Sequence, residues 1–374
     1  MRLRLRESLL HLLLRLLKRF DRRDTSLAAF DPAAVRRILV VSTTALGDTV
    51  MSTAAICAVR RRYPDARLVG HFLAAYLPLF ERMPQLDAAI PYHGGYRRFF
   101  ATIAALRRER FDLALILHGN EPQATPMAYL AGIPFIFKLP NTSRFRFLLA
   151  NPAPVLTWAD LGHGYTQRLR VAELAGADPR GARMELPVTD DDRRRVAALL
   201  AAQGISDETL LIGLQTGASS RGRMWPAPRF AELARTLAQR HPGCRIVLTG
   251  AAGEAAYCRA IGESIGEAAI VLAGEVPLPR LPALVQRLSV LVTGDTGTLH
   301  VAVAVGTPIV GLFAISDPRI SGPAYDLERH VTIHRPCDQG VRSKSDDQSC
   351  IARIGVDEVC AGVEHILAIQ AVPL

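Results

Sequence analysis

Short apolar runs alternate with longer helical segments along most of this chain. Residues 38–42 form an apolar run that predicts a buried strand, and a loop of small residues, 43–47, follows it. Residues 48–62 carry apolar positions at helical spacing, and residues 66–72 predict the next strand. This strand–helix–strand pattern is typical of α/β proteins, in which helices connect parallel strands.

A second series of strands and helices contains the most informative stretch, residues 288–313. Apolar runs at 290–293 and 309–313 predict two buried strands. The small-residue segment 299–305 alternates like a strand, yet we expect a short helix there, because neighbouring parallel strands need a crossover connection. Gly306 would end that helix. Earlier strands of this series are predicted at 210–214, 245–249 and 270–272.

Residues 2–23 predict a basic amphipathic helix. One face of its helical wheel is apolar: Leu9, Leu10, Leu13, Leu16, Leu17 and Phe20. The other face is polar and basic: Arg4, His11, Arg15, Lys18, Arg19 and Arg22. Charges within the run exclude a membrane span, and no small-residue cleavage site indicates a signal peptide. We expect the helix to lie in the headgroup region of an anionic membrane; the alternative is packing on the protein itself or on a partner chain.

The length of 374 residues favours more than one domain. The predicted parts are a basic helix at 1–24, an N-terminal Rossmann-like domain at 36–180, a C-terminal Rossmann-like domain at 188–350 and a C-terminal helix at 355–370. A Pro- and Gly-containing stretch near 178–187 reads as the interdomain linker. Residues 122–157, rich in Pro, Phe and Asn, are expected to be irregular.

Composition and charge narrow the class of protein. An apolar content of 49% with 21% charged residues indicates a packed globular chain. The net charge is +10, and residues 1–24 supply half of it with eight Arg/Lys against three Asp/Glu. A basic patch can bind nucleic acid, a membrane surface or an acidic substrate. No zinc-finger spacing or aromatic-rich basic signature supports a nucleic-acid partner.

Six cysteines in a chain of this length do not indicate a disulfide framework. Cys337, Cys350 and Cys360 lie near the C-terminus, with His334 nearby, but no C-x-x-C pattern occurs. We expect ordinary reduced thiols there rather than a metal site, and a cytosolic protein.

Candidate chemistry begins at the ends of predicted strands. The loop before Asp48 lacks G-x-G-x-x-G, and no phosphate-loop motif occurs, which argues against a dinucleotide oxidoreductase or a P-loop NTPase. Open α/β sheets place their chemistry at the carboxyl ends of strands, where Asp48 could accept a proton from a substrate hydroxyl. The alternative is a helix-capping or first-turn aspartate. His118, at the end of another strand, is a weaker candidate.

A turn of small residues precedes the helix predicted at 299–305. Backbone N–H groups at that helix start, beside Gly297 and the hydroxyls of Thr296 and Thr298, suit a phosphate or diphosphate. An ordinary strand–turn–helix explains the pattern equally well. Elsewhere, Arg97 and Arg98 belong to an arginine-rich segment, from which one or two side chains could meet an anionic acceptor.

Three sequence motifs occur in a specific order. They are ILVVSTTALGDTVMSTAAICAVRRRYPDARL at 38–68, RMWPAPRFAEL at 223–233 and GDTGTLHVAVAVGTPIVGLFAISDP at 294–318. Together they resemble glycosyltransferase family 9, the ADP-heptose:lipopolysaccharide heptosyltransferases, over roughly residues 36–369. The resemblance implies a GT-B fold, with two Rossmann-like domains facing a central cleft. The N-terminal amphipathic helix is an addition to that family core.

The resemblance also implies roles for individual residues. Asp48 matches the family's general base, and Asp295 the acid that opens the third motif. Thr296, Gly297 and Thr298 correspond to the diphosphate-holding turn. Arg223 stands where the family has lysine, and Gly297-Thr298 where many members have Gly-Pro. The remaining expected donor-binding residues are Thr216, Glu254 and His300, and the expected acceptor-binding residues are Arg97, Arg98 and His118.

The activity that the resemblance implies is inverting transfer of heptose from ADP-heptose to an anionic, lipid-linked lipopolysaccharide core acceptor. No cofactor and no metal is expected, since Arg223 and the helix start could neutralise the diphosphate. The protein is expected in the cytoplasm, peripheral on the inner face of the inner membrane through residues 2–23. The alternatives are a GT-B enzyme with another nucleotide sugar or a protein or glycan acceptor, and a non-catalytic nucleotide-sugar-binding member.

Overall fold

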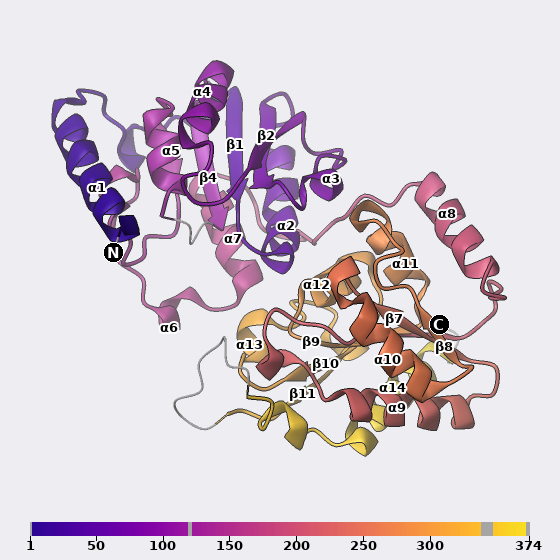
Figure 1. Ribbon diagram of the computed structural model, residues 1–374. Helices are drawn as coiled ribbons and strands as arrows, with labels where there is room; N and C mark the ends of the chain where they lie inside the picture. The colour runs from indigo at the N-terminus through magenta and orange to yellow at the C-terminus, as the bar shows by residue number, and fades with distance from the viewer. Residues whose placement is uncertain (1, 119–121, 338–346, 372–374) are drawn as a thin grey trace. The chain divides into compact units, whose positions relative to one another are not determined.

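The computed structural model describes residues 2–118, 122–337 and 347–371, and the chain divides into two compact units, Met1–Glu185 and Leu186–Leu374 (Figure 1). Each unit is built on one parallel sheet. The division falls within the stretch that the sequence predicts as a linker.

The sheet of the first unit has the strand order β3-β2-β1-β4-β5, all parallel. The strands are β1 Arg37–Ser42, β2 Arg67–Leu73, β3 Ala88–Tyr92, β4 Leu113–His118 and β5 Phe135–Phe137. The helices are α1 Arg2–Phe20, α2 Leu46–Arg62, α3 Leu77–Phe80, α4 Phe99–Glu109, α5 Ala124–Leu130, α6 Trp158–Leu161 and α7 Gly164–Leu174. Because helices cover both faces, the central strands are apolar runs rather than alternating ones.

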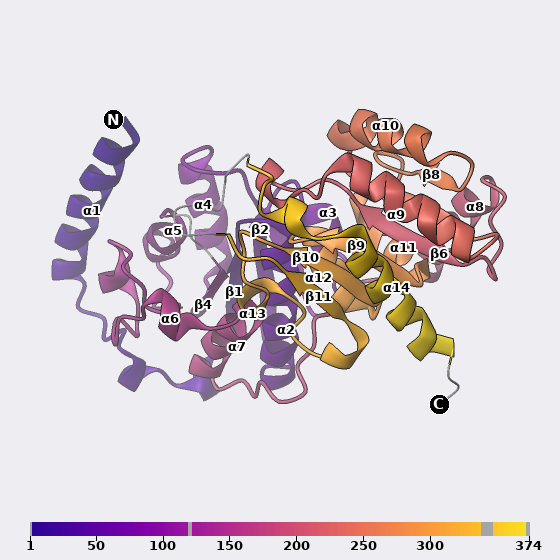
Figure 2. The ribbon, with the colours of Figure 1, turned by 90° about the horizontal axis from the view of Figure 1, so that it is seen from below.

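Two helix pairs cover this sheet. Helices α4 and α5 lie on one side, and α2 and α7 pack together on the other (Figure 2). Helix α2 is enclosed by the sheet on one side and by α7 on another, so its positions 49–59 are all buried. Two expectations were inexact here. Helix α2 begins at Leu46, before Asp48, and residues 122–157 are not irregular throughout, since they contain α5 and β5.

Helix α1 packs on the first unit by a narrow seam that includes part of its predicted polar face. Leu14 is fully buried in the core with α4 and α5 residues, and the His11 ring contacts Phe145 and Phe147. The Lys18 ammonium lies over the Tyr129 ring. The leucine-rich face points away from the protein, with side chains from 41% exposed at Leu17 to 73% at Phe20: Leu9, Leu12, Leu13, Leu16, Leu17 and Phe20. Packing on the protein itself, the alternative from the sequence, is therefore present. It partly buries Leu10 of the predicted apolar face and leaves the rest of that face uncovered.

The second unit holds a six-stranded parallel sheet in the order β11-β10-β9-β6-β7-β8. Its strands are β6 Leu211–Gln215, β7 Arg245–Thr249, β8 Ala269–Val271, β9 Val290–Gly294, β10 Ile309–Phe313 and β11 Val331–His334. Its helices are α8 Asp190–Ala201, α9 Ala227–Arg240, α10 Ala255–Ile265, α11 Leu281–Arg287, α12 Gly297–Val305, α13 Pro318–Ser321 and α14 Val356–Ala371. Strand β11 was not predicted.

The stretch around β9 and β10 folds as the sequence predicts. The segment after β9 is the short helix α12, and Gly306 ends it in the left-handed region, at φ 81°. Both flanking strands are buried at every position. Helices α9, α10 and α14 cover one face of this sheet, where a large apolar core includes the fully buried Trp225.

The cysteine prediction was wrong in part. Cys337 and Cys350 form a disulfide rather than two reduced thiols, and Cys360 is a buried free thiol. Among the described residues, no group of three or more His, Cys, Asp and Glu side chains could hold a metal ion. No helix in the described part of the chain is long and apolar enough to cross a membrane.

Candidate active site

The carboxyl edge of the first sheet holds Asp48. This residue comes after β1 and a short loop and occupies the first turn of α2, where a negative charge is favoured by the helix dipole. Ala45 is the N-cap residue, so Asp48 is not the N-cap itself. The side chain of Asp48 is 26% exposed, which leaves part of the carboxylate accessible.

Two neighbours hold the Asp48 carboxylate by its two oxygens. The Arg168 Nη2 atom of α7 lies 2.8 Å from Oδ1, and the Thr44 hydroxyl donates to Oδ2 at 3.0 Å. Thr44 has a single hydroxyl proton, which it gives to the carboxylate. The His118 Nδ1 atom lies 2.5 Å from the Thr44 hydroxyl oxygen. The structure thus brings together two sequence candidates, Asp48 and His118, both through Thr44 and directly, since His118 Nε2 lies 3.6 Å from Asp48 Oδ1.

Burial shapes the charges around this carboxylate. Desolvation, followed by the nearby Arg168 cation, lowers the pKa of His118 to about 4, so the imidazole is neutral at pH 7. Desolvation also lowers the pKa of Lys138, which follows β5, to about 8. The Lys138 ammonium is near enough to lower the pKa of His118 further. The carboxylate therefore lies in a region with two cations, the buried Arg168 and the half-buried Lys138.

The two arginines expected to meet the acceptor follow β3 at the same edge of the sheet. Arg97 and Arg98 are exposed just before α4, and Arg98 adopts a left-handed backbone conformation at φ 53°. In the sheet order, β3 is separated from β1 by β2. The structure thus places Arg97 and Arg98 at the same edge of the sheet as Asp48.

In the second unit, the turn after β9 meets the segment before α9. Arg223 Nη1 lies 3.2 Å from Asp295 Oδ2. Gly294 permits this approach, because a Cβ at that position would lie 2.6 Å from the Arg223 carbonyl oxygen. The Arg223 Nε atom is buried without a hydrogen-bond partner among the described residues. Asp295, the acid of the third motif, is thus paired with the arginine of the second motif.

The buried amide of Gln215 links three elements beneath this turn. Its Oε1 accepts hydrogen bonds from Thr298 at 3.1 Å and from Thr249 at 3.0 Å. The Thr298 side chain therefore faces the sheet, and its hydroxyl is already engaged. Thr296, the N-cap of α12, has its hydroxyl 3.1 Å from that of Thr293. Gly297 is the first residue of α12, so the turn offers mainly backbone N–H groups to a ligand.

Three further donor candidates surround the same edge. The Glu254 carboxylate packs against Gly217, where a Cβ would lie 1.6 Å from Glu254 Oε1, and it accepts from the Ala251 N–H at 2.7 Å. Thr216, buried at the end of β6, contacts the Cys258 thiol at 3.4 Å. His300 is only 3% exposed, within α12. Glu254 and Thr216 thus follow the neighbouring strands β7 and β6, beside the turn after β9.

Sequence reasoning missed four residues that organise these clusters. Arg168 and Lys138 come from distant parts of the chain, so no local pattern connects them with Asp48. Thr44 and Gln215 carry a signal that could have been used, since each is a polar residue at or just after the end of a buried strand.

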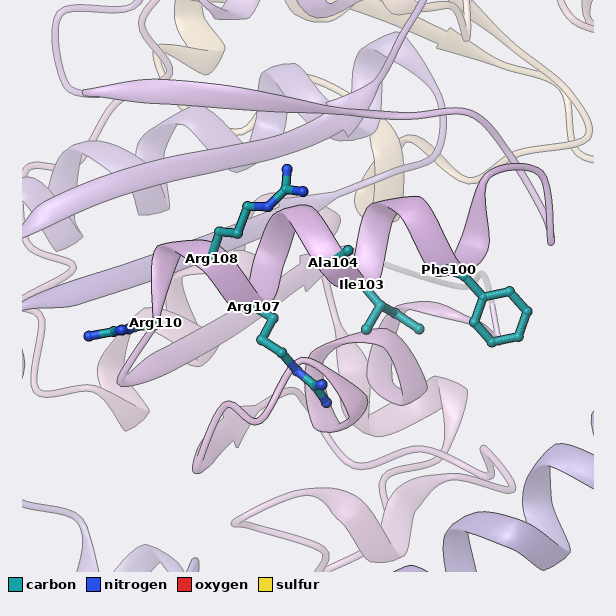
Figure 3. A pocket seen from close by; sticks show the side chains of 6 residues that line it. All are labelled: Phe100, Ile103, Ala104, Arg107, Arg108 and Arg110. Atoms are coloured by element: carbon teal, nitrogen blue, oxygen red, sulfur yellow. The ribbon is translucent and has the colours of Figure 1, made fainter.

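A hollow of about 630 Å³ lies elsewhere on the first unit (Figure 3). Its lining comes from α4 and the residue that caps it: Phe100, Ile103, Ala104, Arg107, Arg108 and Arg110. The three guanidinium groups point in different directions and do not converge on one point (Figure 3). None of the candidate site residues lines this hollow.

The family model "Glycosyltransferase family 9 (heptosyltransferase)" matches residues 99–350. Lipopolysaccharide heptosyltransferase 2 of Salmonella typhimurium is 29% identical over 325 residues, covering 79% of this chain and 88% of the relative.

Two solved structures share the fold, which confirms the predicted architecture of two Rossmann-like units. A family 9 glycosyl transferase from Veillonella parvula superimposes with a TM-score of 0.76 at 21% identity, covering 89% of this chain and 97% of the other. The E. coli ADP-heptose lps heptosyltransferase II gives a TM-score of 0.73 at 24% identity, covering 90% and 100%.

Proposed function

This chain belongs to glycosyltransferase family 9, and we propose that it transfers heptose from ADP-heptose to an anionic sugar of a lipopolysaccharide core, with inversion at the anomeric carbon. The relatives named above support the donor and the acceptor class. The observation that carries the chemistry is the Asp48 carboxylate, held by hydrogen bonds to both of its oxygens and still partly accessible.

In the proposed reaction, Asp48 is the general base. The acceptor hydroxyl gives its proton to the carboxylate as its oxygen attacks the anomeric carbon of the donor. The new C–O bond forms while the bond from the anomeric carbon to the diphosphate oxygen breaks, and that electron pair leaves with ADP. A single in-line displacement of this kind inverts the configuration and needs one base and a stabilised leaving group.

The second unit supplies the groups for the leaving diphosphate. We assign diphosphate binding to the Arg223 guanidinium and to the backbone N–H groups of Thr296, Gly297 and Thr298. Asp295 holds Arg223 in position through its ion pair. Thr216, Glu254 and His300 complete the proposed donor site, with Glu254 directed to the hydroxyl groups of the ribose.

The first unit supplies the groups for an anionic acceptor. His118, neutral and bonded to Thr44, lies beside the base and can contact the acceptor sugar. We assign Arg97 and Arg98 to more distant acidic groups of the acceptor, because both side chains are exposed at the same edge of the sheet. Lys138 adds a positive charge close to His118.

Helix α1 fits the surface on which a lipid-linked acceptor lies. Its outward face presents the exposed leucines and Phe20, and basic residues Arg15 and Arg19 are exposed on the same helix. An amphipathic basic helix of this kind binds anionic headgroups with its apolar side in the interface. We therefore propose a peripheral location on the cytoplasmic face of the inner membrane.

The test is a transfer assay with a panel of donors. The purified protein is incubated with heptose-deficient lipopolysaccharide and ADP-heptose, and parallel reactions contain UDP-, GDP- and other ADP-sugars. The expected result is an acceptor heavier by one heptose, together with released ADP, from ADP-heptose only. Efficient transfer from a UDP- or GDP-sugar, or no transfer from any donor, would contradict the proposal.

A further inference from the structure

Arg168 is buried far more completely than an arginine on a helix ordinarily is. Its side chain is 2% exposed, in the region where α7 packs on α2. Burying a guanidinium costs several kcal/mol unless a counter-charge and hydrogen bonds compensate for the lost water. The contacts of this side chain therefore indicate what keeps it in place.

The guanidinium of Arg168 bonds to Asp48 and to the backbone of its own helix. Nη2 donates to Asp48 Oδ1 at 2.8 Å, and Nη1 donates to the carbonyl oxygen of Gly164 at 2.6 Å, one turn earlier in α7. The Nε atom has no hydrogen-bond partner among the residues that the structure describes. A buried ion pair as a whole can be replaced by well-packed apolar side chains at little cost, so attaching α7 to α2 does not by itself require Arg168 and Asp48.

Gly164 provides the room for this reach. A Cβ at position 164 would lie 2.9 Å from Arg168 Nη1 and 3.1 Å from Met51 Sδ. Either atom would have to shift, and Arg168 Nη1 is bonded to the carbonyl of that same residue. The absence of a side chain at Gly164 thus allows the guanidinium to cross from α7 to the Asp48 carboxylate on α2.

We propose that Arg168 is a positioning residue for sugar transfer, which holds the Asp48 carboxylate ionised and in one orientation. This inference rests on the proposed function, because it takes Asp48 as the base. A general base must be ionised before it accepts a proton, and its oxygen must point at the acceptor hydroxyl. Arg168 bonds to Oδ1 and Thr44 bonds to Oδ2, so both oxygens are held in a carboxylate that is still 26% exposed.

The surrounding charges give Arg168 a second effect. The described groups that act on His118 are Arg168 from α7, Asp48 from α2 and Lys138 after β5. Burial and then Arg168 lower the pKa of His118, and Asp48 opposes them. Arg168 therefore also helps to keep His118 neutral beside the Asp48 carboxylate.

The test compares five variants of the full chain for kcat, KM and pH profile. Arg168→Met removes the charge, Arg168→Lys keeps it, and Gly164→Ala displaces the guanidinium without removing it. Arg170→Met is the matched control, since this neighbour on α7 is half-buried and bonds to the carbonyl of Asp160 instead. Asp48→Asn marks complete loss of the base.

For Arg168→Met we expect kcat to fall about 100-fold, because a misplaced catalytic group lowers the rate by about that factor. We expect the affinity for ADP to stay within about twofold and the acidic limb of the pH–rate profile to move to higher pH. Arg168→Lys should recover most of the rate, Gly164→Ala should show a smaller loss, and Arg170→Met should behave as wild type. By NMR titration, the pKa of His118 should rise in Arg168→Met, a readout that does not depend on turnover.

Unchanged kcat and pH profile in Arg168→Met, with Asp48→Asn inactive, would overturn the inference and leave the proposed function standing. An active Asp48→Asn would instead overturn the base assignment, and this inference with it. If Arg168→Met fails to fold, the test uses Arg168→Lys and Gly164→Ala instead. Wild-type rates and pH profiles in both of these variants would also overturn the inference.

Discussion

Arg223 and Asp295, from motifs far apart in the sequence, form an ion pair of 3.2 Å at the carboxyl edge of the second sheet. The pair places a guanidinium beside the start of α12, where backbone N–H groups are directed outwards. The approach of the two segments depends on Gly294, which leaves space for the Arg223 carbonyl. The guanidinium and the outward backbone N–H groups together favour a diphosphate at this turn.

Removing Arg223 should weaken nucleotide binding. We expect Arg223→Met to raise the Kd for ADP about tenfold or more, because a charge-assisted contact to the diphosphate is lost. Asp295→Asn should cause a smaller loss, since the guanidinium remains but is no longer held. Calorimetry with ADP measures both effects, and Arg221→Met is the control, an exposed arginine in the same segment. Wild-type affinity in Arg223→Met would refute this assignment.

The contact between Glu254 and Gly217 predicts a steric effect on donor binding. A Cβ at Gly217 would overlap Glu254 Oε1, so Gly217→Ala must displace the carboxylate. If that carboxylate binds the ribose, Gly217→Ala and Glu254→Gln should weaken ADP binding to a similar extent, about tenfold. Gly253→Ala is the matched control, because a Cβ there meets nothing within 4 Å. Full affinity in Gly217→Ala would show that the position of Glu254 does not matter.

The outward leucines of α1 predict membrane binding. Leu13→Glu with Leu16→Glu should reduce sedimentation with anionic vesicles at least tenfold, since two exposed apolar side chains are lost from the binding face. Wild-type binding should also weaken as salt rises. Leu327→Glu, at an exposed leucine of the second unit, should bind as wild type. The α1 double variant should turn over a lipid-free acceptor at the wild-type rate. If this double variant bound vesicles as well as Leu327→Glu does, the membrane proposal would be contradicted.

The buried His71 predicts a loss of stability in acid. Burial lowers its pKa to about 4, and Nδ1 lies 2.9 Å from the carbonyl oxygen of Ile90. In the unfolded chain the pKa is near 6.5, so the unfolded state takes up the proton first as pH falls. The part of the unfolding free energy that depends on a neutral His71 is fully present above pH 6.5. It is lost as the pH falls from 6.5 to about 4, and the loss is at most about 3 kcal/mol.

Urea unfolding at several pH values measures this contribution. His71→Asn keeps a nitrogen near the Nδ1 position and cannot titrate, so its unfolding free energy should decline less steeply between pH 6.5 and pH 5. The exposed His365 serves as the control, and His365→Asn should keep the wild-type slope. An identical slope in His71→Asn would mean that this histidine does not titrate as expected.

The sequence predicted the fold well where burial imposes a strong pattern. Strands covered on both faces are continuous apolar runs, so β1, β6, β7, β9 and β10 were located within a residue or two. The segment at β5 and α5 was missed because the strand has only three residues and Pro126 interrupts the helical pattern. Periodicity is weak in elements of that length.

The candidate site was only partly accessible from the sequence. Asp48 and the turn at Asp295 follow strand ends, and local pattern identifies such positions. The Arg168 contact to Asp48 joins residues from different elements, and tertiary packing alone creates it. The same limit applies to helix α1. A helical wheel identifies its apolar face, but it does not show which side of the helix packs on the protein.

The most direct test of the central claim is single-turnover transfer by Asp48→Asn. The asparagine keeps the size of the side chain and cannot accept a proton, so we expect the transfer rate to fall about 1000-fold. ADP affinity, measured by calorimetry on the same preparation, should remain at the wild-type value. Transfer at a rate close to that of wild type would contradict the assignment of Asp48 as the general base.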